Sequence, residues 1–545
     1  MDTKTSEPNL QLDYDVVVVG AGFAGIYALW KAKKMGYKVK GFERASDVGG
    51  TWFWNSYPGA RCDVESYNYA YFFDDSIVRD WEWSDACASQ EEIQRYLRFV
   101  ADRCAILGDI SFSTKIESVQ YVEASGLWRL SDSNSKSLTC RYPILAIGAL
   151  SEPKKPDIEG VEDFMGDTYF TSNWPRDNLV DFRGKRVGVI GTGSSGVQAI
   201  PEIAKAASEL YVFQRTANYV TPTRSGPMET ELVLSIKKDP KAVRRAARES
   251  FGGHTPLAMG EERYLELDEE GRERALQKAW DGKYVPLAFR DAYLPEANDA
   301  ISDFIRKKML EQVDDPWTAK HLIPWDHPYG GKRPCMSNVY LQTYNFPHVH
   351  LIPLSESPIE QIDERGIKVS NQYIPLDVIV FATGFDAISG PLFAIDIRGL
   401  NGQSINEAWK DGPANYLGTM VNGFPNLFLP SSAMSPSVLS NMATLAEQQI
   451  DFILDSIDWL EKNGRPGMQP TKEAQNFWQQ ETLRYAKKRP GALTTKSWYS
   501  GANIPGKPRI FMVYCGGFKR YNETCYQELE DGFPSYELLT KALNR

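Results

Sequence analysis

Histidine is scarce in this chain of 545 residues, which has five, and its seven cysteines are scattered along the sequence. No two cysteines show the C-x-x-C spacing of a dithiol redox centre, and an odd number of scattered cysteines does not suit a disulfide framework. The histidines also lack the spacing of metal ligands. The sequence therefore predicts no metal site and no disulfide-based chemistry.

Long apolar runs are also missing. The N-terminal stretch MDTKTSEPNLQLDYD has no apolar signal core, and the run VVVVGAGFAGIYALW is broken by glycines and too short to cross a bilayer. The formal net charge of -10 is not gathered into a block of one sign, so neither nucleic acid nor an acidic membrane is an expected partner. We expect a cytoplasmic protein without stable membrane insertion, acting as a monomer on small molecules. Its length predicts two or three hydrophobic cores.

A strand, a glycine loop and a helix follow one another near the N-terminus. The β-branched run YDVVVV, Tyr14 to Val19, is typical of a buried parallel strand, and it leads into GAGFAG with Gly20, Gly22 and Gly25. The first two glycines allow a tight turn and close approach to a pyrophosphate, and the third lets the helix pack on the strand. The next strand ends in Glu43, where a carboxylate can accept hydrogen bonds from a ribose diol. This unit predicts a site for an unphosphorylated ribose, such as that of FAD.

The same pattern occurs once more. The strand KRVGVI, Lys185 to Ile190, leads into GTGSSG at residues 191–196, and the following strand runs into Gln214 and Arg215 in place of an acid. Arg215 can bind a 2′-phosphate, which a carboxylate would repel. The second site is therefore predicted to take NADP. Two sites of opposite ribose preference indicate hydride transfer from NADPH to a flavin.

The order of these units predicts an α/β fold with two Rossmann-like dinucleotide-binding domains and a helical insertion in the NADP domain. The expected bounds are 1–150 for the first part of the FAD domain, 151–222 for the first part of the NADP domain, 223–328 for the helical insertion, 329–384 for the second part of the NADP domain and 385–545 for the second part of the FAD domain. The last part is expected to hold a substrate-pocket loop and a loop that covers NADP. We expect the charge runs of the insertion, such as KAVRRAARESF, to be solvated faces, and LAEQQIDFILDSIDWLEKNG to be an amphipathic helix.

Four further motifs carry a family resemblance. They are GGTWFWNSYPGARCD at residues 49–63, GKRPCM at 331–336, PSVLSNM at 436–442 and SWYSGANIPGKPR at 497–509. Together with the glycine loops, they resemble the motifs of flavin-dependent Baeyer-Villiger monooxygenases, the single-chain FAD and NADPH type. The resemblance runs from about residue 14 to about residue 521. It implies an NADPH- and O2-dependent enzyme that converts a ketone to an ester or lactone.

The glycine loops and the resemblance together mark the expected site residues. For FAD they are Gly20, Gly22, Phe23, Gly25, Glu43, Arg44, Gly50, Thr51, Trp52, Asp63, Val64, Tyr69 and Met442. For NADP they are Arg61, Gly191, Thr192, Gly193, Ser194, Ser195, Gly196, Gln198, Arg215, Thr216, Lys332 and Trp498. The substrate pocket is expected at Leu150, Leu439, Ser440 and Met442.

The resemblance also implies two catalytic residues, Arg333 and Asp63. In such enzymes a deprotonated flavin peroxide attacks the ketone carbonyl, and the adduct rearranges to the ester. A guanidinium stays protonated near neutral pH and offers several donors in a fixed fork, so Arg333 suits stabilisation of the peroxide and of the adduct oxyanion. The Asp63 carboxylate beside it would hold that fork in place.

The aromatic stretch FMGDTYFTSNWPRD departs from the resemblance at one position. The family signature F-x-G-x-x-x-H-x-x-x-W-P matches at Phe164, Gly166, Trp174 and Pro175, but Phe170 stands where the signature has histidine. The resemblance implies a hinge-like connection between the nucleotide domains. Phe170 either fills the same space by packing or removes a hydrogen bond that supports coupling of NADPH use to product.

Two other functions stay open. An N- or S-hydroxylating flavin monooxygenase, or a weakly coupled NADPH oxidase, would share both glycine loops. The motif at residues 49–63 together with Lys332 and Arg333 favours the Baeyer-Villiger reaction over these. A catalytically silent flavin- and NADP-binding module is supported by Phe170 alone.

Overall fold

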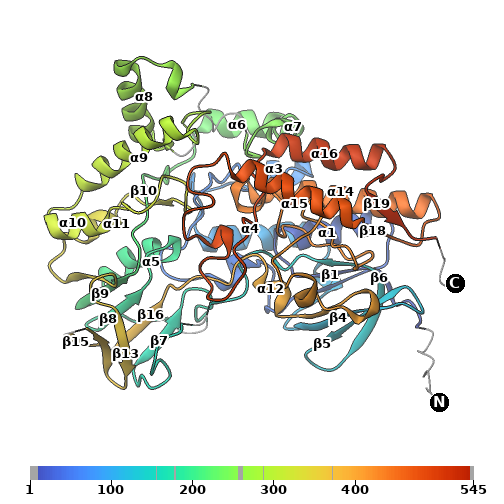
Figure 1. Cartoon of the computed structure of the whole chain (residues 1–545), viewed down its shortest axis with the longest axis horizontal. Helices are drawn as coiled ribbons and strands as arrows, with labels where there is room; N and C mark the ends of the chain where they lie inside the picture. The colour runs from blue at the N-terminus through green and yellow to red at the C-terminus, as the bar shows by residue number, and fades with distance from the viewer. Residues whose placement is uncertain are drawn as a thin grey trace.

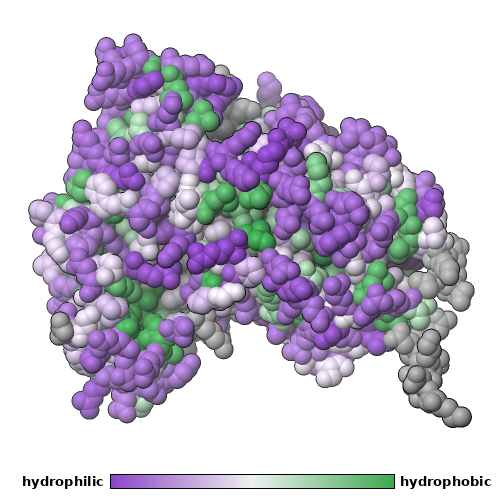
Figure 2. Space-filling model, viewed as in Figure 1, coloured by the Kyte–Doolittle hydropathy of each residue, from purple (hydrophilic) through white to green (hydrophobic). Residues whose placement is uncertain are grey.

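Two lobes, each built around a sheet with parallel strands, make up the protein (Figure 1). The computed structural model describes residues 10–154, 156–176, 179–255, 262–285, 288–370 and 372–540. Figure 2 shows hydrophilic residues over most of one face, apolar residues gathered near its middle, and an indentation between the lobes along its lower edge. The expected α/β class, with two Rossmann-like sheets and a helical insertion, is confirmed.

The first sheet has seven strands in the order β17-β4-β5-β6-β1-β2-β3. Their bounds are β1 Tyr14–Val19, β2 Val39–Phe42, β3 Ile110–Ser111, β4 Ile116–Val122, β5 Leu127–Asp132, β6 Ser137–Leu145 and β17 Asp396–Arg398. Strand β1 pairs in parallel with β2 and β6, whereas β4, β5 and β6 pair antiparallel. Val16 and Val18 lie in one hydrophobic core, and Val17 and Val19 lie in another. The continuous valine run is therefore explained by burial on both faces of the sheet.

The second sheet has five parallel strands in the order β12-β9-β8-β16-β7. Their bounds are β7 Asp167–Phe170, β8 Arg186–Ile190, β9 Glu209–Gln214, β12 Val349–Pro353 and β16 Val378–Phe381. Smaller sheets are formed by β10 Val220–Thr221 with β11 Cys335–Met336, by β13 Ile359–Asp363, β14 Gly366–Val369 and β15 Gln372–Pro375, and by β18 Met468–Pro470 with β19 Tyr536–Leu538. The chain thus builds the first sheet, then the second, and returns to the first at β17.

Helices cover both sheets and fill the space above them (Figure 1). Those of the first part of the chain are α1 Phe23–Lys34, α2 Thr51–Trp54, α3 Asp75–Asp80, α4 Gln90–Arg103 and α5 Ser194–Ala204. The middle part holds α6 Thr230–Lys238, α7 Pro240–Glu249, α8 Glu269–Asp281, α9 Pro295–Leu310, α10 Pro316–Leu322 and α11 Tyr340–Thr343. The last part holds α12 Gly390–Phe393, α13 Ile405–Ala408, α14 Met442–Lys462, α15 Lys472–Ala486 and α16 Phe518–Glu530.

The helical insertion divides between the two lobes. Helices α8, α9 and α10 contribute Leu276, Ile305 and Leu322 to the same core as the second sheet. Helices α6 and α7 instead pack against α3, α14 and α16, and Ile236 of α6 lies in the core of the first lobe. The insertion therefore contacts both lobes rather than forming a separate layer on one of them.

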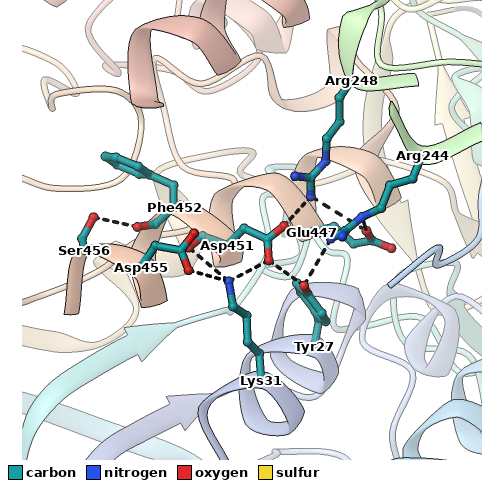
Figure 3. A network of polar contacts seen from close by, with 9 residues as sticks. All are labelled: Tyr27, Lys31, Arg244, Arg248, Glu447, Asp451, Phe452, Asp455 and Ser456. Carbon is teal, nitrogen blue, oxygen red and sulfur yellow. Dashed lines mark hydrogen bonds and ion pairs between the residues drawn. The ribbon is translucent and has the colours of Figure 1, made fainter. Parts of the chain in front are cut away.

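The charge run on α7 is solvated only in part: Lys241, Arg245 and Glu249 are exposed, but two of its arginines are paired inside the protein, and for these the prediction was wrong. Arg244 and Arg248 meet Glu447 and Asp451 of α14, whose side chains are 3% and 9% exposed (Figure 3). Arg244 lies 2.6 Å from Glu447 and 2.8 Å from Asp451, and Arg248 lies 2.5 Å from Asp451. Lys31 of α1 adds a third cation 2.8 Å from Asp451. The two arginines are partly buried, and their partner carboxylates lie on another helix, 203 residues farther along the chain.

Asp451 is the centre of this arrangement. Burial alone would raise the pKa of the Asp451 carboxyl. The nearby cations Arg248, Lys31 and Arg244 have the larger, opposite effect, so the pKa falls to about 2. The Asp451 cluster, as we call it, comprises Tyr27, Lys31, Arg244, Arg248, Glu447, Asp451 and Asp455 (Figure 3). It joins α1, α7 and α14 through paired charges.

Helix α14 is also more buried than an amphipathic helix would be. Its polar residues Glu447, Gln448, Gln449 and Asp451 are all buried. Helices α1, α7 and α16 pack against it, and its carboxylates are paired in the Asp451 cluster. The helix was predicted correctly, but its polar side faces other helices rather than solvent.

The aromatic stretch around Phe170 begins as the edge strand of the second sheet. Phe170 of β7 pairs with Phe381 of β16, and the two rings stack with centroids 4.9 Å apart and an interplanar angle of 18°. Beyond the strand, Arg176 donates through Nη1 to the carbonyl of Phe53 at 2.6 Å. The stretch therefore connects the second sheet to α2 of the first lobe, and Phe170 makes a packing contact within the sheet.

Asp451→Asn should destabilise the protein, because three cations would lose the carboxylate that they share. Removing one partner of a buried ion pair costs about 3 kcal/mol or more, and we expect a lower melting temperature of the purified protein near neutral pH. Asp455→Asn is the matched control, since Asp455 is 35% exposed and pairs with Lys31 at 2.8 Å. It should cost less than about 1 kcal/mol, so equal melting temperatures of the two variants would contradict the prediction.

The difference between the parent protein and Asp451→Asn should also depend on pH. In the folded protein the pKa of Asp451 is about 2, below the ordinary value of about 4. The stabilisation is therefore complete above about pH 4 and is lost as the pH falls toward about 2. The two melting temperatures should converge over this acid range.

Candidate active site

One cavity of about 1020 Å³ lies between the two sheets. Its lining includes residues that directly follow β1, β2 and β6 of the first sheet and β8, β9 and β16 of the second. The carboxyl ends of parallel strands are where open α/β sheets bind ligands. The volume is at the upper end of the range of about 300 to 1,000 Å³ that is usual for ligand pockets. Residues of both sheets can therefore contact a ligand in this cavity.

The first glycine loop is packed too closely for any side chain. Gly20 has a φ of +101°, and a Cβ placed on it would lie 2.4 Å from the carbonyl oxygen of Ala146. A Cβ on Gly25 would lie 1.8 Å from the carbonyl oxygen of Gly20. The loop can therefore turn tightly from β1 into α1, and the N-terminus of α1 presents its free amides to the cavity.

The second glycine loop repeats this geometry. Gly191 has a φ of +112°, and a Cβ placed on it would lie 2.4 Å from the carbonyl oxygen of Ala382. A Cβ on Gly196 would lie 2.2 Å from the carbonyl oxygen of Gly191. Both loops thus form the cradle that a pyrophosphate needs at the start of a helix. The protein has two such cradles facing one cavity.

Glu43 lies beside the first glycine loop, where a carboxylate can bind the ribose of a dinucleotide. Its two carboxylate oxygens accept the backbone N–H groups of Ala21 and Ala45, each at 2.7 Å. Burial raises the pKa of Glu43, although these amides favour the charged form. A carboxylate can accept more than one hydrogen bond at each oxygen, so Glu43 retains capacity for two ribose hydroxyls.

The second loop has cations in the corresponding place. Gln214 turns away from the cavity and donates to the carbonyl of His321 at 2.7 Å. Arg215 and Lys332 line the cavity instead. Burial lowers the pKa of Lys332, and the neighbouring Arg215 lowers it further, while Asp326 opposes the shift. Two adjacent cations beside a helix N-terminus suit a 2′-phosphate.

Asp63 and Arg333 form an ion pair at the junction of the two lobes. The Nε and Nη2 atoms of Arg333 both lie 3.4 Å from Oδ2 of Asp63, and Nη1 donates to the carbonyl of Val438 at 3.3 Å. The Asp63 side chain is 14% exposed and that of Arg333 is 35% exposed. Burial raises the pKa of Asp63, and the guanidinium partly offsets that shift. Arg333 therefore keeps a paired carboxylate behind it and an open side toward the cavity.

Helix α5 of the second lobe also bonds the segment that carries Asp63. Gln198 donates through Nε2 to the carbonyl of Arg61 at 3.0 Å and to Oδ1 of Asp63 at 3.4 Å. Its Oε1 accepts the hydroxyl of Tyr57 at 2.8 Å. The amide side chain of Gln198 thus fixes the segment of Asp63 to helix α5, which begins in the second glycine loop.

Comparison with known proteins decides the family. Residues 14–234 match the family described as pyridine nucleotide-disulphide oxidoreductase. The chain is 38% identical to a 2-oxo-Δ3-4,5,5-trimethylcyclopentenylacetyl-CoA monooxygenase of Pseudomonas putida, over 99% of this chain and all of the relative. It is 37% identical to a Baeyer-Villiger monooxygenase of Pseudooceanicola batsensis, over 96% of both chains. The chain belongs to the Baeyer-Villiger monooxygenases.

Two further similarities bear on the chemistry of this Baeyer-Villiger monooxygenase. The solved structure of an oxidized steroid monooxygenase bound to NADP matches with a TM-score of 0.91 and 41% identity, over 97% of this chain and all of that one. A phenazine N-monooxygenase of Lysobacter antibioticus is 37% identical over 94% of this chain and 95% of the relative. Similarity over nearly the whole chain thus extends to a relative named for oxidation at nitrogen.

The protein is an FAD-dependent oxidoreductase that uses NADP, and its own residues fit both cofactors. A Cβ at Gly20 or Gly191 would collide with the backbone of Ala146 or Ala382, so only glycine allows the tight turns that shape the two cradles. Glu43 fits an unphosphorylated ribose, whereas Arg215 and Lys332 fit a phosphorylated one.

Most of the predicted site residues of this Baeyer-Villiger monooxygenase line the one cavity. They are Gly20, Gly22, Phe23, Glu43, Arg44, Gly50, Thr51, Trp52, Arg61, Asp63, Val64, Tyr69, Leu150, Gly191, Thr192, Gly193, Ser194, Ser195, Gln198, Arg215, Thr216, Lys332, Arg333, Ser440, Met442 and Trp498. Gly25 and Gly196 lie behind the cradles, outside this lining. Leu439 is also outside it, and Val438 of the same loop contacts Arg333 instead.

Lys154 is a cavity residue that the sequence interpretation missed. It lies in the segment that follows β6, and its Nζ donates to the carbonyl of Asn503 at 2.9 Å. A signal was present, because SEPKKP follows the small-residue turn at the carboxyl end of a strand. The sequence did not reveal that this segment lies beside Arg215.

Gly25→Ala and Gly196→Ala should separate the two cofactors of this Baeyer-Villiger monooxygenase. Each added methyl would collide with the carbonyl of its own loop, at 1.8 Å for Gly25 and 2.2 Å for Gly196. We expect Gly25→Ala to be purified with little FAD. We expect Gly196→Ala to retain FAD but to bind NADP+ at least about tenfold more weakly. Flavin absorbance per protein and titration with NADP+ measure the two effects.

Each glycine variant is the control for the other. A loss of FAD from both variants would indicate general misfolding. Full FAD content in Gly25→Ala would contradict the assignment of the first cradle.

Proposed function

We propose that this Baeyer-Villiger monooxygenase converts a ketone to an ester or lactone, with Arg333 binding the oxygen on which negative charge develops. The observation that carries the proposal is the Asp63–Arg333 pair, which faces the cavity lined by both glycine loops. FAD reduced by NADPH supplies the activated dioxygen. The role of the protein is to orient the reactants and to stabilise charge.

Arg333 has the protonation state and the free donors that this role requires. Burial alone would lower its pKa, but Asp63 raises it, and the net pKa lies above the ordinary value. A guanidinium has five N–H donors. Two are directed to Asp63 and one to Val438, through Nε, Nη2 and Nη1. One N–H on Nη1 and one on Nη2 are left for an oxyanion in the cavity.

Asp63 supports Arg333 without contacting the reacting atoms. An unpaired cation in a partly dry cavity is costly, and a carboxylate close behind it offsets that cost. The carboxylate also restrains the plane of the guanidinium, so that its remaining donors point in a fixed direction. We therefore assign Asp63 a positioning role.

The relatives support a ketone as the substrate class, and their names include cyclic ketones as well as acetone. The Pseudomonas putida relative is named for a 2-oxo-cyclopentenyl compound, and a solved relative is named a steroid monooxygenase. Leu150, Ser440 and Met442 line the part of the cavity that we propose as the substrate pocket. Oxidation at a nitrogen atom of the substrate is the second candidate function, because one relative is named a phenazine N-monooxygenase.

We also propose that the protein acts as a monomer in the cytoplasm. Among the described residues, no helix is both long and apolar enough to cross a bilayer. The domain bounds expected from the sequence remain a prediction.

The purified yellow protein, incubated with NADPH, air and a panel of cyclic and open-chain ketones, should form an ester or lactone from at least one ketone. NADPH consumption and product mass are followed together. A matched panel of aromatic nitrogen heterocycles tests the second candidate. Products only from the heterocycles would favour oxidation at nitrogen, and NADPH loss without any product would contradict both candidates.

Arg333→Ala should keep reduction of the flavin by NADPH but abolish most ester formation. Loss of one preorganised electrostatic contact costs about a hundredfold in rate or more, and bleaching of the flavin without oxygen measures the reduction step separately. Arg333→Lys is the matched control, because it keeps the charge but loses the fork. Ester formation by Arg333→Ala at the parental rate would remove Arg333 from the mechanism.

A further inference from the structure

Three cations line one part of the cavity at the second glycine loop. They are Lys154, Arg215 and Lys332. Burial lowers the pKa of both lysines, and Arg215 contributes to the shift in each case. Arg215 is therefore close to both lysines, one from the segment after β6 and one from the segment before β11.

These cations lack ion-pair partners. In the described ranges, no carboxylate lies within salt-bridge distance of Lys154, Arg215 or Lys332. Asp157 and Asp386 both attract Lys154, but Asp157 forms no salt bridge with it, and the Asp386 carboxylate is paired with Lys507, whose side chain is 7% exposed. Adjacent cations in a partly buried place repel one another unless an anion binds among them. The three cations are therefore suited to bind an anion.

The backbone of Lys154 is held in place on both sides. Its N–H donates to the carbonyl of Gly384 at 3.0 Å, and its own carbonyl accepts the hydroxyl of Thr383 at 3.1 Å. Both partners follow β16 of the second sheet. The side chain therefore starts from a fixed point at the edge of the cavity.

We propose that Lys154 is a third ligand of the 2′-phosphate of NADP, beside Arg215 and Lys332, and helps the enzyme select NADP over NAD. The proposal rests on the use of NADP in the function above. A phosphate monoester carries about -1.5 to -2 charges and three strong acceptor oxygens, which match three cations. An ammonium has three donors, and only one of those on Lys154 is used, by Asn503.

The contact with Asn503 links this phosphate site to the segment that carries Trp498. Asn503 also donates to the carbonyl of Phe385 at 2.9 Å, and Lys507 of the same segment donates to the carbonyl of Ala387 at 3.1 Å. Lys154 therefore lies between the proposed phosphate site and the segment that carries Trp498. A simple anchoring role for Lys154 in this segment is the alternative that an experiment must separate.

The dissociation constants of NADP+ and NAD+ for the FAD-loaded protein separate the two roles. Lys154→Met removes the charge and keeps most of the side-chain length. One charge-assisted hydrogen bond is worth about tenfold or more in affinity. We expect binding of NADP+ to weaken by about tenfold, with NAD+ changing by less than about twofold. Lys154→Arg should restore most of the preference.

Two control variants make the outcome decisive. Lys507→Met disturbs the Trp498 segment without removing a cavity residue, and it should affect NADP+ and NAD+ alike. Arg215→Met should weaken NADP+ selectively. If Lys154→Met weakens both nucleotides equally, as Lys507→Met does, or weakens neither, the proposal is overturned. If Arg215→Met leaves NADP+ binding unchanged, the whole phosphate site is wrongly placed. None of these binding measurements depends on ketone oxidation, so they test the phosphate site separately from the proposed reaction.

Discussion

A carboxylate and a guanidinium shielded from bulk water remain charged at low cost only as a pair. Asp63 and Arg333 are 270 residues apart in the chain and belong to different lobes. Their contact requires the carboxyl ends of both sheets to face the same cavity. The residues that would bind the two cofactors and the cation that we propose to stabilise developing charge are therefore positioned together. Gln198 strengthens this arrangement by bonding the Asp63 segment to the helix that follows the second cradle.

The parts of the site that the sequence predicted are those with local causes. Gly25 approaches the carbonyl of Gly20 within one loop, and Gly196 approaches Gly191 in the same way. A glycine is required there whatever the rest of the chain does, so the pattern can be interpreted without a structure. The family resemblance added Arg333 and its neighbours, which no local pattern would have identified.

The parts that the sequence did not predict depend on distant partners. Arg244 looked like a solvated charge because its partner Glu447 lies 203 residues away. Lys154 was overlooked because its proximity to Arg215 arises only when β6 and β9 are placed in their sheets. The stretch that holds Phe170 was expected to connect the nucleotide domains, and the sequence did not indicate that Phe170 itself is a strand residue stacked on Phe381. In each case the long-range neighbour, rather than the residue type, determines the role.

Strand β17 has a consequence for how the protein folds during synthesis. It pairs with β4, and Gln120 donates to Asp396 at 3.0 Å across a sequence separation of 276 residues. Until residues 396–398 have left the ribosome, β4 is an exposed edge strand with unpaired backbone groups. The entire second lobe is synthesised during that interval. The nascent chain therefore carries an open sheet edge for much of its translation.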